Sequence, residues 1–190
     1  MMKNTITRCQ WVPQNNLLYQ KYHDEEWGVP VHDDQKHFEF LILEGAQAGL
    51  TWLTILKRRE GYKKSFANFD PKAVASFNEE NIQELLINPE IIRNQLKIRA
   101  AVNNARQFLK IQKEFGSFDQ YIWSFVEHKP IKHTIEKLQD YPVQIPEAEN
   151  LSLDLKKRGF KFIGPKIIYA HIQACGLVDD HMECCFRRRS

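Results

Sequence analysis

The chain has 190 residues, 43% of them hydrophobic, and its 27 basic and 24 acidic side chains leave a formal net charge of +3. This length fits one domain with a substantial core, and no charge-free apolar run of about 18 residues is present to span a membrane. The first residues lack the apolar segment of a signal peptide, so we expect a cytoplasmic protein. Its four cysteines are then expected to be thiols or metal ligands and not disulfides.

The segment from Cys9 to Trp27 is rich in aromatic side chains. Pro13 and two asparagines near its start predict an irregular backbone there. The aromatic residues of the segment are Trp11, Tyr19, Tyr22 and Trp27. They can form a packed corner of the core or, because phenol and indole rings carry polar edges, a wall that faces a ligand. The sequence leaves both interpretations open.

Residues 40–56 form the stretch around which the chain is organised, and they contain one charge, Glu44. Apolar positions at helical spacing predict a buried helix that stops at Gly49, followed by a second helix that Thr51 caps. Glu44 therefore falls near the C-terminal end of the first helix, where the helix dipole disfavours a negative charge. A carboxylate at this place indicates either a functional group or a side chain satisfied by an arginine or by backbone N–H groups.

The remaining segments also predict helices. Asp33 or Asp34 caps the helix of Glu44. Further helical patterns cover residues 79–86, 91–115, 118–126, 148–158 and 165–175. The broad apolar face of the longest pattern holds Ile92, Leu96, Val102, Ala105, Phe108 and Leu109. Residues 128–147 contain three prolines and predict a surface connection. No strand-like alternation is present, so the fold class is all-α.

Residues 159–164 form a turn between the last two predicted helices, with a glycine at each end. Free N–H groups at the start of the second helix offer a phosphate site. Basic residues surround the turn: Lys156, Lys157, Arg158, Lys161 and Lys166. A helix-turn-helix with a solvated basic rim would give the same pattern. The glycine spacing is wider than in the Gly-x-Gly hairpin of DNA-binding proteins, so we expect binding to a phosphate backbone without base readout.

Cysteine and histidine occur near both ends of the chain. Two thiolates and two imidazoles are a tetrahedral zinc set, and four protein ligands make such a site structural. The candidate ligands are Cys9, His23, His181 and Cys185. Packed thiols with solvated histidines are the alternative, and Cys184 is a rival for Cys185. Cys175 follows an apolar helix and is expected to be a core thiol. The other histidines show no partner pattern and are interpreted as structural or solvated: His32, His37, His128, His133 and His171.

Taken together, several blocks of the sequence resemble the 3-methyladenine DNA glycosylase I family, in the family's order, over residues 8–185. These blocks are RCQWV, YHDEEWGVP, LEGAQAGLTW, KKRGFKFIGP and QACGLVDDH with the CC that follows. The resemblance implies a single all-α helix-hairpin-helix glycosylase domain, here expected over residues 1–190. It also implies a structural zinc ion that joins the N- and C-terminal segments.

The resemblance assigns roles residue by residue. Glu44 matches the carboxylate that contacts the damaged base, and Tyr22 and Trp52 match residues that hydrogen-bond to the base and stack on it. The other matching pocket aromatics are Trp11, Tyr19 and Trp27, and the matching zinc ligands are Cys9, His23, His181 and Cys185. The residues expected to contact DNA lie at the turn of residues 159–164 and at the break between the two helices of residues 40–56. They are Gly164, Lys161, Lys166 and Leu50. Leu50 is the candidate wedge for the gap that a flipped base leaves.

The implied enzyme is a monofunctional DNA glycosylase that flips out and hydrolyses off N3-methylated adenine and leaves an abasic site. This base is cationic within its nucleotide, so an aromatic wall attracts it and Glu44 favours it without acting as a strong acid. Strand cleavage would need an amine nucleophile, and residues 40–56 contain no lysine. The expected partner is double-stranded DNA with an alkylated purine. We expect a monomer without membrane contact.

The sequence departs from the family pattern at three places, and it leaves two other functions open. The sequence has one extra residue between Cys9 and Tyr19, a proline at 165 that removes one N–H group, and a short arginine-rich tail. Asp180 is interpreted as an orienting group for His181 or the backbone, with a more active part of Asp179 or Asp180 as the alternative. The rival functions are a non-catalytic reader of alkylated DNA and a zinc-stapled protein-interaction domain.

Overall fold

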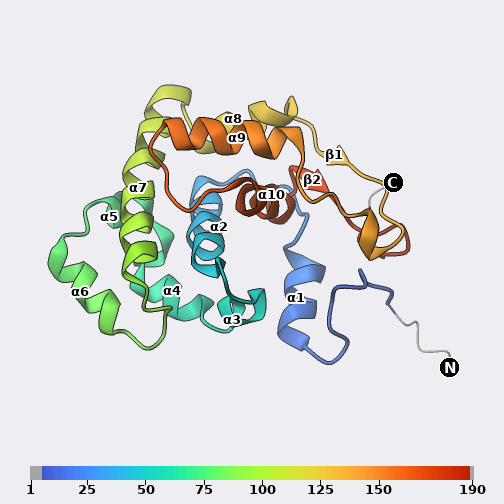
Figure 1. Cartoon of the computed structure of the whole chain (residues 1–190), viewed down its shortest axis with the longest axis horizontal. Coiled ribbons are helices and arrows are strands. Elements are labelled where there is room, and N and C mark those ends of the chain that lie inside the picture. The colour runs from blue at the N-terminus through green and yellow to red at the C-terminus, as the bar shows by residue number, and fades with distance from the viewer. Residues whose placement is uncertain (1–5, 189–190) are drawn as a thin grey trace.

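The computed structural model describes residues 6–188 and is mostly helical (Figure 1). The helices are α1 (Leu17–Glu25), α2 (Asp34–Gln47), α3 (Trp52–Leu56), α4 (Arg59–Ser65), α5 (Pro71–Ala75), α6 (Glu79–Ile87), α7 (Gln95–Phe115), α8 (Phe118–Trp123), α9 (Pro146–Lys157) and α10 (Pro165–Ala174). Short 3-10 turns are η1 (Ala67–Phe69), η2 (Ser124–Val126) and η3 (Leu138–Asp140), and the strands are β1 (Ile131–Lys132) and β2 (Val178–Asp179). No helix in this part of the chain has the length and apolarity needed to cross a bilayer. The ends of the predicted 1–190 domain, residues 1–5 and 189–190, lie outside the described residues.

Helix α2 lies at the centre of the molecule beside α10 (Figure 1). Nine of its fourteen residues are buried, because other helices pack on several of its sides. Asp33 caps it by accepting a hydrogen bond from the Lys36 N–H, which settles the choice between the two predicted caps. Gly49 has a φ of 79°, a left-handed conformation that suits glycine at a helix end. Thr51 caps α3 by accepting from the Thr54 N–H, so the predicted break between the two helices is confirmed.

Helix α7 begins four residues later than its sequence pattern predicts. The Asn94 side chain accepts a hydrogen bond from the Lys97 N–H and starts the helix at Gln95. In this first turn Lys97 and Ile98 face α2, so Leu96 points away and is 70% exposed. The prediction that Leu96 belongs to the apolar face is therefore wrong.

The connection over residues 128–147 is held to the body of the protein at several points. Ile135 and Ile145 are buried, and β1 pairs in parallel with β2, with Ile131 opposite Val178. Two-residue strands are too short to show an alternating pattern, which explains why the sequence did not indicate them. The pairing of β1 with β2 fixes the backbone position of Asp179 and of the residues that follow it.

The N- and C-terminal segments of the described chain run side by side. The Phe186 N–H donates to the Thr7 carbonyl oxygen over 2.9 Å, and the Gln10 N–H lies 3.2 Å from the Met182 sulfur. Arg8 binds Asp24 through hydrogen bonds of 2.6–2.9 Å. The fold therefore brings the cysteines and histidines of both ends within reach of one another.

Candidate active site

Aromatic side chains from distant parts of the chain surround one cavity of about 350 Å³. For comparison, an engineered cavity of about 150 Å³ in a protein core holds benzene. The aromatic lining consists of Trp11, Tyr19, Tyr22, Trp27, Trp52 and Tyr141. All the aromatic residues predicted for a pocket are therefore brought together, which favours the ligand-facing wall over a filled corner of the core.

The rings of this wall hold one another in place. Trp11 contacts Trp27 edge to face with centroids 4.8 Å apart, and Tyr22 lies 5.3 Å from Trp52. The Trp11 indole N–H donates to the Tyr141 hydroxyl over 3.1 Å. The Trp52 indole N–H is buried and has no hydrogen-bond partner among the described residues. A buried donor without a partner is costly, so this N–H is available to a ligand.

Glu44 lines the same cavity from α2 and is only 3% exposed. Its Oε2 lies 3.0 Å from Nδ1 of His171 on α10, so its partner is neither an arginine nor a backbone N–H group. Burial raises the pKa of Glu44 well above its ordinary value. Burial, followed by the charge of Glu44, also raises the pKa of Tyr22 well above the usual range. The cavity therefore combines aromatic rings with one deeply buried carboxyl group.

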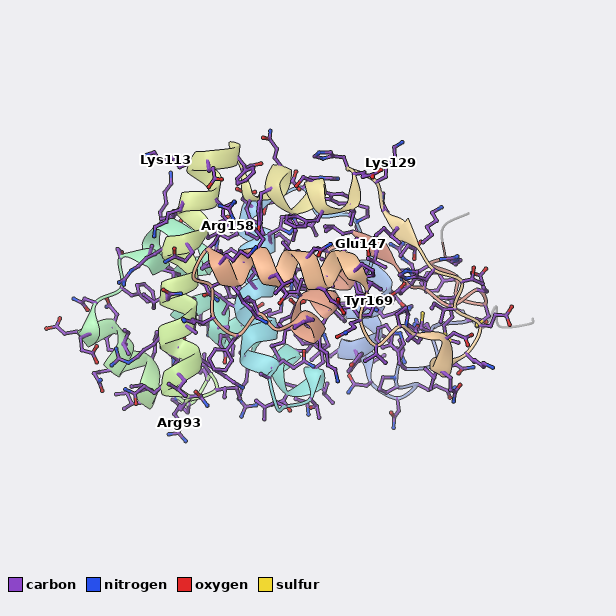
Figure 2. The ribbon with its side chains drawn as sticks, turned by 45° about the horizontal axis from the view of Figure 1, so that its top comes forward. Arg93, Lys113, Lys129, Glu147, Arg158 and Tyr169 are labelled. Carbon is purple, nitrogen blue, oxygen red and sulfur yellow. The ribbon has the colours of Figure 1, made fainter. Side chains whose placement is uncertain are left out.

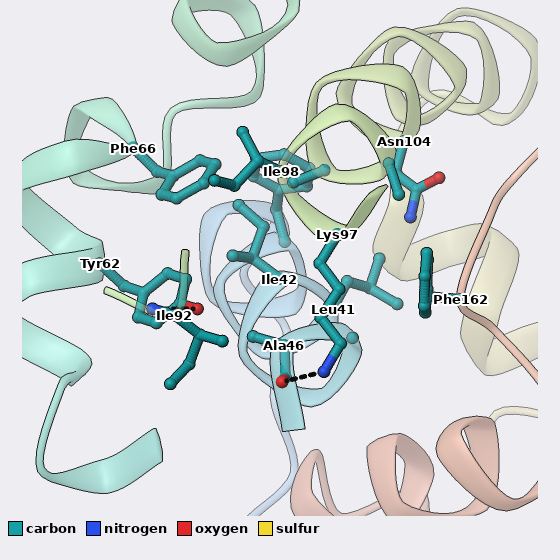
Figure 3. Close-up of a pocket in the computed structure, with 14 residues that line it drawn as sticks. Leu41, Ile42, Ala46, Tyr62, Phe66, Ile92, Lys97, Ile98, Asn104 and Phe162 are labelled. Carbon is teal, nitrogen blue, oxygen red and sulfur yellow. Dashed lines mark hydrogen bonds between the residues drawn. The ribbon is translucent and has the colours of Figure 1, made fainter. Parts of the chain in front are cut away.

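A second cavity, on another face of α2, is mostly apolar (Figure 3). Lys97 lines it, but its Nζ donates to the Ala46 carbonyl oxygen over 2.8 Å and also to that of Ala48. The ammonium group thus caps the C-terminal end of α2, where a positive charge is favourable. With its cation engaged and no carboxylate in its lining, this cavity offers nothing to a cationic ligand, so the candidate site is the cavity of Glu44.

The turn between α9 and α10 is fastened to α7 and α2. The Asn104 side chain accepts from the Lys161 N–H over 2.8 Å and donates to the Lys161 carbonyl oxygen over 2.9 Å. Asn103 donates to the Gly159 carbonyl oxygen over 2.8 Å. Phe162 has a φ of 53°, and its side chain lies against Gly45 of α2. The turn therefore has a defined position relative to the helix that carries Glu44.

The residues predicted to contact DNA lie near this turn and the end of α2. Lys161 and Lys166 are exposed, and Leu50 is 39% exposed. Leu50 and Lys166 line one groove, which Glu44 also reaches. Arg158 differs from the other basic residues of the cluster, because it binds Glu114 and Asp154 over 2.7 and 2.6 Å. It lies at the end of α9 next to α7 (Figure 2), and these carboxylates already engage its charge.

The structure also brings together the predicted metal ligands from the two chain ends. Cys9, His23 and Cys185 are buried, with their ligand atoms within 4.8 Å of one another. The ring of His181 lies 5.4 Å from that of His23, and its buried Nε2 has no partner among the described residues. Cys184 is exposed and lies outside this cluster. The geometry thus fits a metal ion bound by Cys9, His23 and Cys185, and the unpartnered Nε2 of His181 is the candidate for a fourth ligand.

Each histidine of this cluster has a carboxylate on its other ring nitrogen. His23 Nδ1 lies 2.8 Å from Asp24, and His181 Nδ1 lies 2.8 Å from Asp179. Such carboxylates orient metal-binding imidazoles.

The prediction that Asp180 orients His181 or the backbone is wrong. Asp180 instead accepts hydrogen bonds from Tyr169 and Gln173 and pairs with His133. Adjacent side chains of an extended segment point in opposite directions, and here Asp179 is the one on the side of His181.

The family model described as Methyladenine glycosylase matches residues 11–188. The chain belongs to this family. It is 46% identical over 183 residues to the DNA-3-methyladenine glycosylase 1 of Escherichia coli (strain K12). This match covers 95% of the present chain and 97% of the relative. This glycosylase also has the fold of solved relatives.

Two solved structures illustrate the likeness. A crystal structure of a 3-methyladenine DNA glycosylase I has a TM-score of 0.93 at 46% identity and covers 96% of this chain and 100% of its own. A variant of such an enzyme in complex with 3-methyladenine has a TM-score of 0.90 at 38% identity, with 93% and 95% covered. The mostly helical fold and the glycosylase class predicted from sequence are thereby confirmed.

The cavity of this glycosylase includes residues that the sequence did not single out: Gln47, Leu138, Tyr141 and Gln173. Tyr141 lies in the connection before α9, where three prolines gave no sign of a ligand site. His171 had no partner pattern because Glu44, its partner, is 127 positions away. Gln173 stands in the block that carried the family resemblance, which was the only available signal for it.

Proposed function

We propose that this glycosylase hydrolyses 3-methyladenine from alkylated double-stranded DNA and leaves an abasic site. The observation that carries the proposal is a buried carboxyl group, Glu44, within a cavity of aromatic rings. Aromatic faces attract a cationic base, and a nearby carboxylate favours the same positive charge. The names of the relatives and the solved complex with 3-methyladenine support this substrate.

The base must leave the duplex stack to enter the cavity. In the proposed complex Trp52 stacks on the flipped base, and its free indole N–H and the Tyr22 hydroxyl are polar groups beside it. Leu50 fills the gap in the duplex, since its exposed side chain stands at the groove that leads to Glu44. Backbone groups of the turn at residues 159–166 hold the phosphates on either side.

We also propose one structural zinc ion bound by Cys9, His23, His181 and Cys185. Its support is the cluster of buried donor atoms, the Nε2 of His181 without a protein partner, and the carboxylates behind both imidazoles. Hydrogen bonds with Cys9 and then with His23 lower the pKa of the Cys185 thiol, which favours the thiolate that metals bind. The ion would join the two chain ends and lies outside the reaction.

Methylated duplex DNA provides the test of the reaction. We expect release of free 3-methyladenine, measured by chromatography, from strands that stay intact until alkali cleaves the abasic sites. Unmethylated duplex is the matched control. Tight binding without base release would identify a non-catalytic reader of damage. A covalent enzyme–DNA adduct trapped by borohydride would contradict a monofunctional enzyme, because it requires a Schiff base.

The contact with phosphates is tested at Gly164. A side chain added there meets no atom within 4 Å, and the φ of −60° is accessible to any residue. Gly164 is the N-cap residue of α10, a position that suits aspartate, so Gly164→Asp should fold normally. We expect its negative charge to weaken duplex binding about tenfold or more at low salt, independently of sequence.

Gly164→Ala is the control, because it adds a side chain without charge and should bind nearly as the wild type does. Affinities are measured by fluorescence anisotropy over a range of salt concentrations. Equal affinity and equal salt dependence of the aspartate variant and the wild type would place the DNA elsewhere.

A further inference from the structure

We propose that His171 is a positioning residue for Glu44. Its neutral imidazole donates a hydrogen bond from Nδ1 to Oε2 of Glu44 and leaves Oε1 unprotonated as the acceptor for the flipped base. The inference rests on the proposed role of Glu44. It explains how a carboxyl group that is only 3% exposed can stay ionised, although burial alone favours its neutral form.

The contact joins two central helices. Glu44 belongs to α2 and His171 to α10, and the imidazole is completely buried. A distance of 3.0 Å between Oε2 and Nδ1 is a good hydrogen bond. Since the bond uses one carboxylate oxygen, the orientation of the whole group toward the cavity is restricted. Hydrogen bonding to the ionised form also opposes the effect of burial.

In the proposed arrangement Cys175 is the partner of the second ring nitrogen of His171. Its Sγ lies 3.7 Å from Nε2 of His171, one helical turn along α10. Burial raises the pKa of this thiol well above its usual range, so it remains S–H and donates to Nε2. Nε2 is then the acceptor and Nδ1 carries the proton. A protonated Glu44 would need the opposite tautomer, in which Nε2–H donates to the weakly accepting sulfur of Cys175.

Burial keeps the imidazole of this pair neutral. Burial lowers the pKa of His171 to about 3, so it stays uncharged at neutral pH. The titratable groups that face the pair are Tyr22 from α1, His37 from α2 and Cys175 directly after α10. Asp119 of α8 lies behind His37, and Lys36 and Glu39 lie farther along α2.

His37, His171 and Cys175 also present ligand atoms within 4.8 Å of one another. A divalent ion there, with one thiolate and two neutral imidazoles, would leave a charge of +1 behind Glu44. That charge would offset the attraction of Glu44 for a cationic base. A hydrogen-bonded thiol and imidazole keep the charge of Glu44 intact, so the proposed role of Glu44 favours them over a second metal site.

The ionisation of Glu44 is measured directly by 13C NMR of protein labelled at the glutamate carboxyl carbon, with the signal assigned by its loss in Glu44→Gln. We expect the titration midpoint of Glu44 to rise by about 1–2 pH units in His171→Phe, as loss of a hydrogen bond to a charged group implies. His171→Asn keeps an N–H donor near the position of Nδ1 and should recover part of this shift. His37→Leu is the control, since His37 is equally buried but has no hydrogen bond to Glu44. In this variant the titration midpoint of Glu44 should stay unchanged.

Activity supplies a second measurement. The acidic limb of the kcat–pH profile for base release should move upward together with the NMR midpoint, whereas a purely structural role of His171 would lower only the melting temperature. If the wild type releases no 3-methyladenine, the proposed function fails. The titration of Glu44 then still decides whether His171 donates a hydrogen bond to it. Equal midpoints in the wild type and His171→Phe would overturn the proposal.

The wild type alone offers a test that does not depend on the folding of a variant. 15N NMR of the histidine rings should show a proton on Nδ1 of His171 and none on Nε2. The reverse tautomer would overturn the proposal. So would elemental analysis that finds one metal ion fewer per chain in His171→Phe than in the wild type, because coordination would then replace the hydrogen bond from Cys175.

Discussion

Replacing Glu44 by glutamine is expected to slow the release of 3-methyladenine about 100-fold, the size typical for loss of one electrostatic contact to the reacting group. Glutamine keeps the size of the side chain and can still accept from His171. It removes the negative charge that favours a cationic base, so discrimination against unmodified adenine should fall as well. Single-turnover rates on methylated duplex, compared with rates on unmodified duplex, measure both effects.

Glu39→Gln is the matched control for this variant. Glu39 lies on the same helix and is also buried, but it binds Arg59 and Lys36 and does not line the cavity. We expect it to lower thermal stability while leaving the single-turnover rate close to that of the wild type. Unchanged activity in Glu44→Gln would show that Glu44 has only a structural role.

Replacing Cys185 by serine is expected to remove the proposed zinc ion and to destabilise the protein strongly. Binding of a structural zinc ion contributes directly to folding free energy, and its loss would leave Cys9, His23 and His181 buried without their common partner. We expect the free energy of unfolding to fall by about 4 kcal/mol or more, which lowers the melting temperature by roughly 10 °C. Elemental analysis and calorimetry measure the two effects.

Cys184→Ser provides the comparison, because Cys184 precedes Cys185 in the chain but is exposed. This variant should retain about one zinc ion per chain and the melting temperature of the wild type. Zinc that persists in Cys185→Ser and disappears in Cys184→Ser would reverse the choice of ligand. Wild-type protein purified without added metal and free of zinc would contradict the proposed site.

Local chemistry explains which parts of the fold were predictable. The break after α2 depends on Gly49 and Thr51, which act through their own backbone conformation and through a hydrogen bond to a residue three positions away. Such short-range interactions are visible in the sequence. Leu96 shows the limit of this reasoning, since the cap at Asn94 decides where α7 starts but neighbouring helices decide which side of its first turn is covered.

The sequence by itself determined the helical class, the family resemblance, and the residue types of the cavity and of the metal cluster. Only the tertiary structure decided their partners. It placed His171 on Glu44 and Asp179 in place of Asp180 on His181, and it brought Tyr141 to Trp11. The reason is physical: a buried polar group must find a partner, but any helix packed against it can supply that partner. Packing over more than a hundred residues, and not spacing along the chain, makes that choice for Glu44.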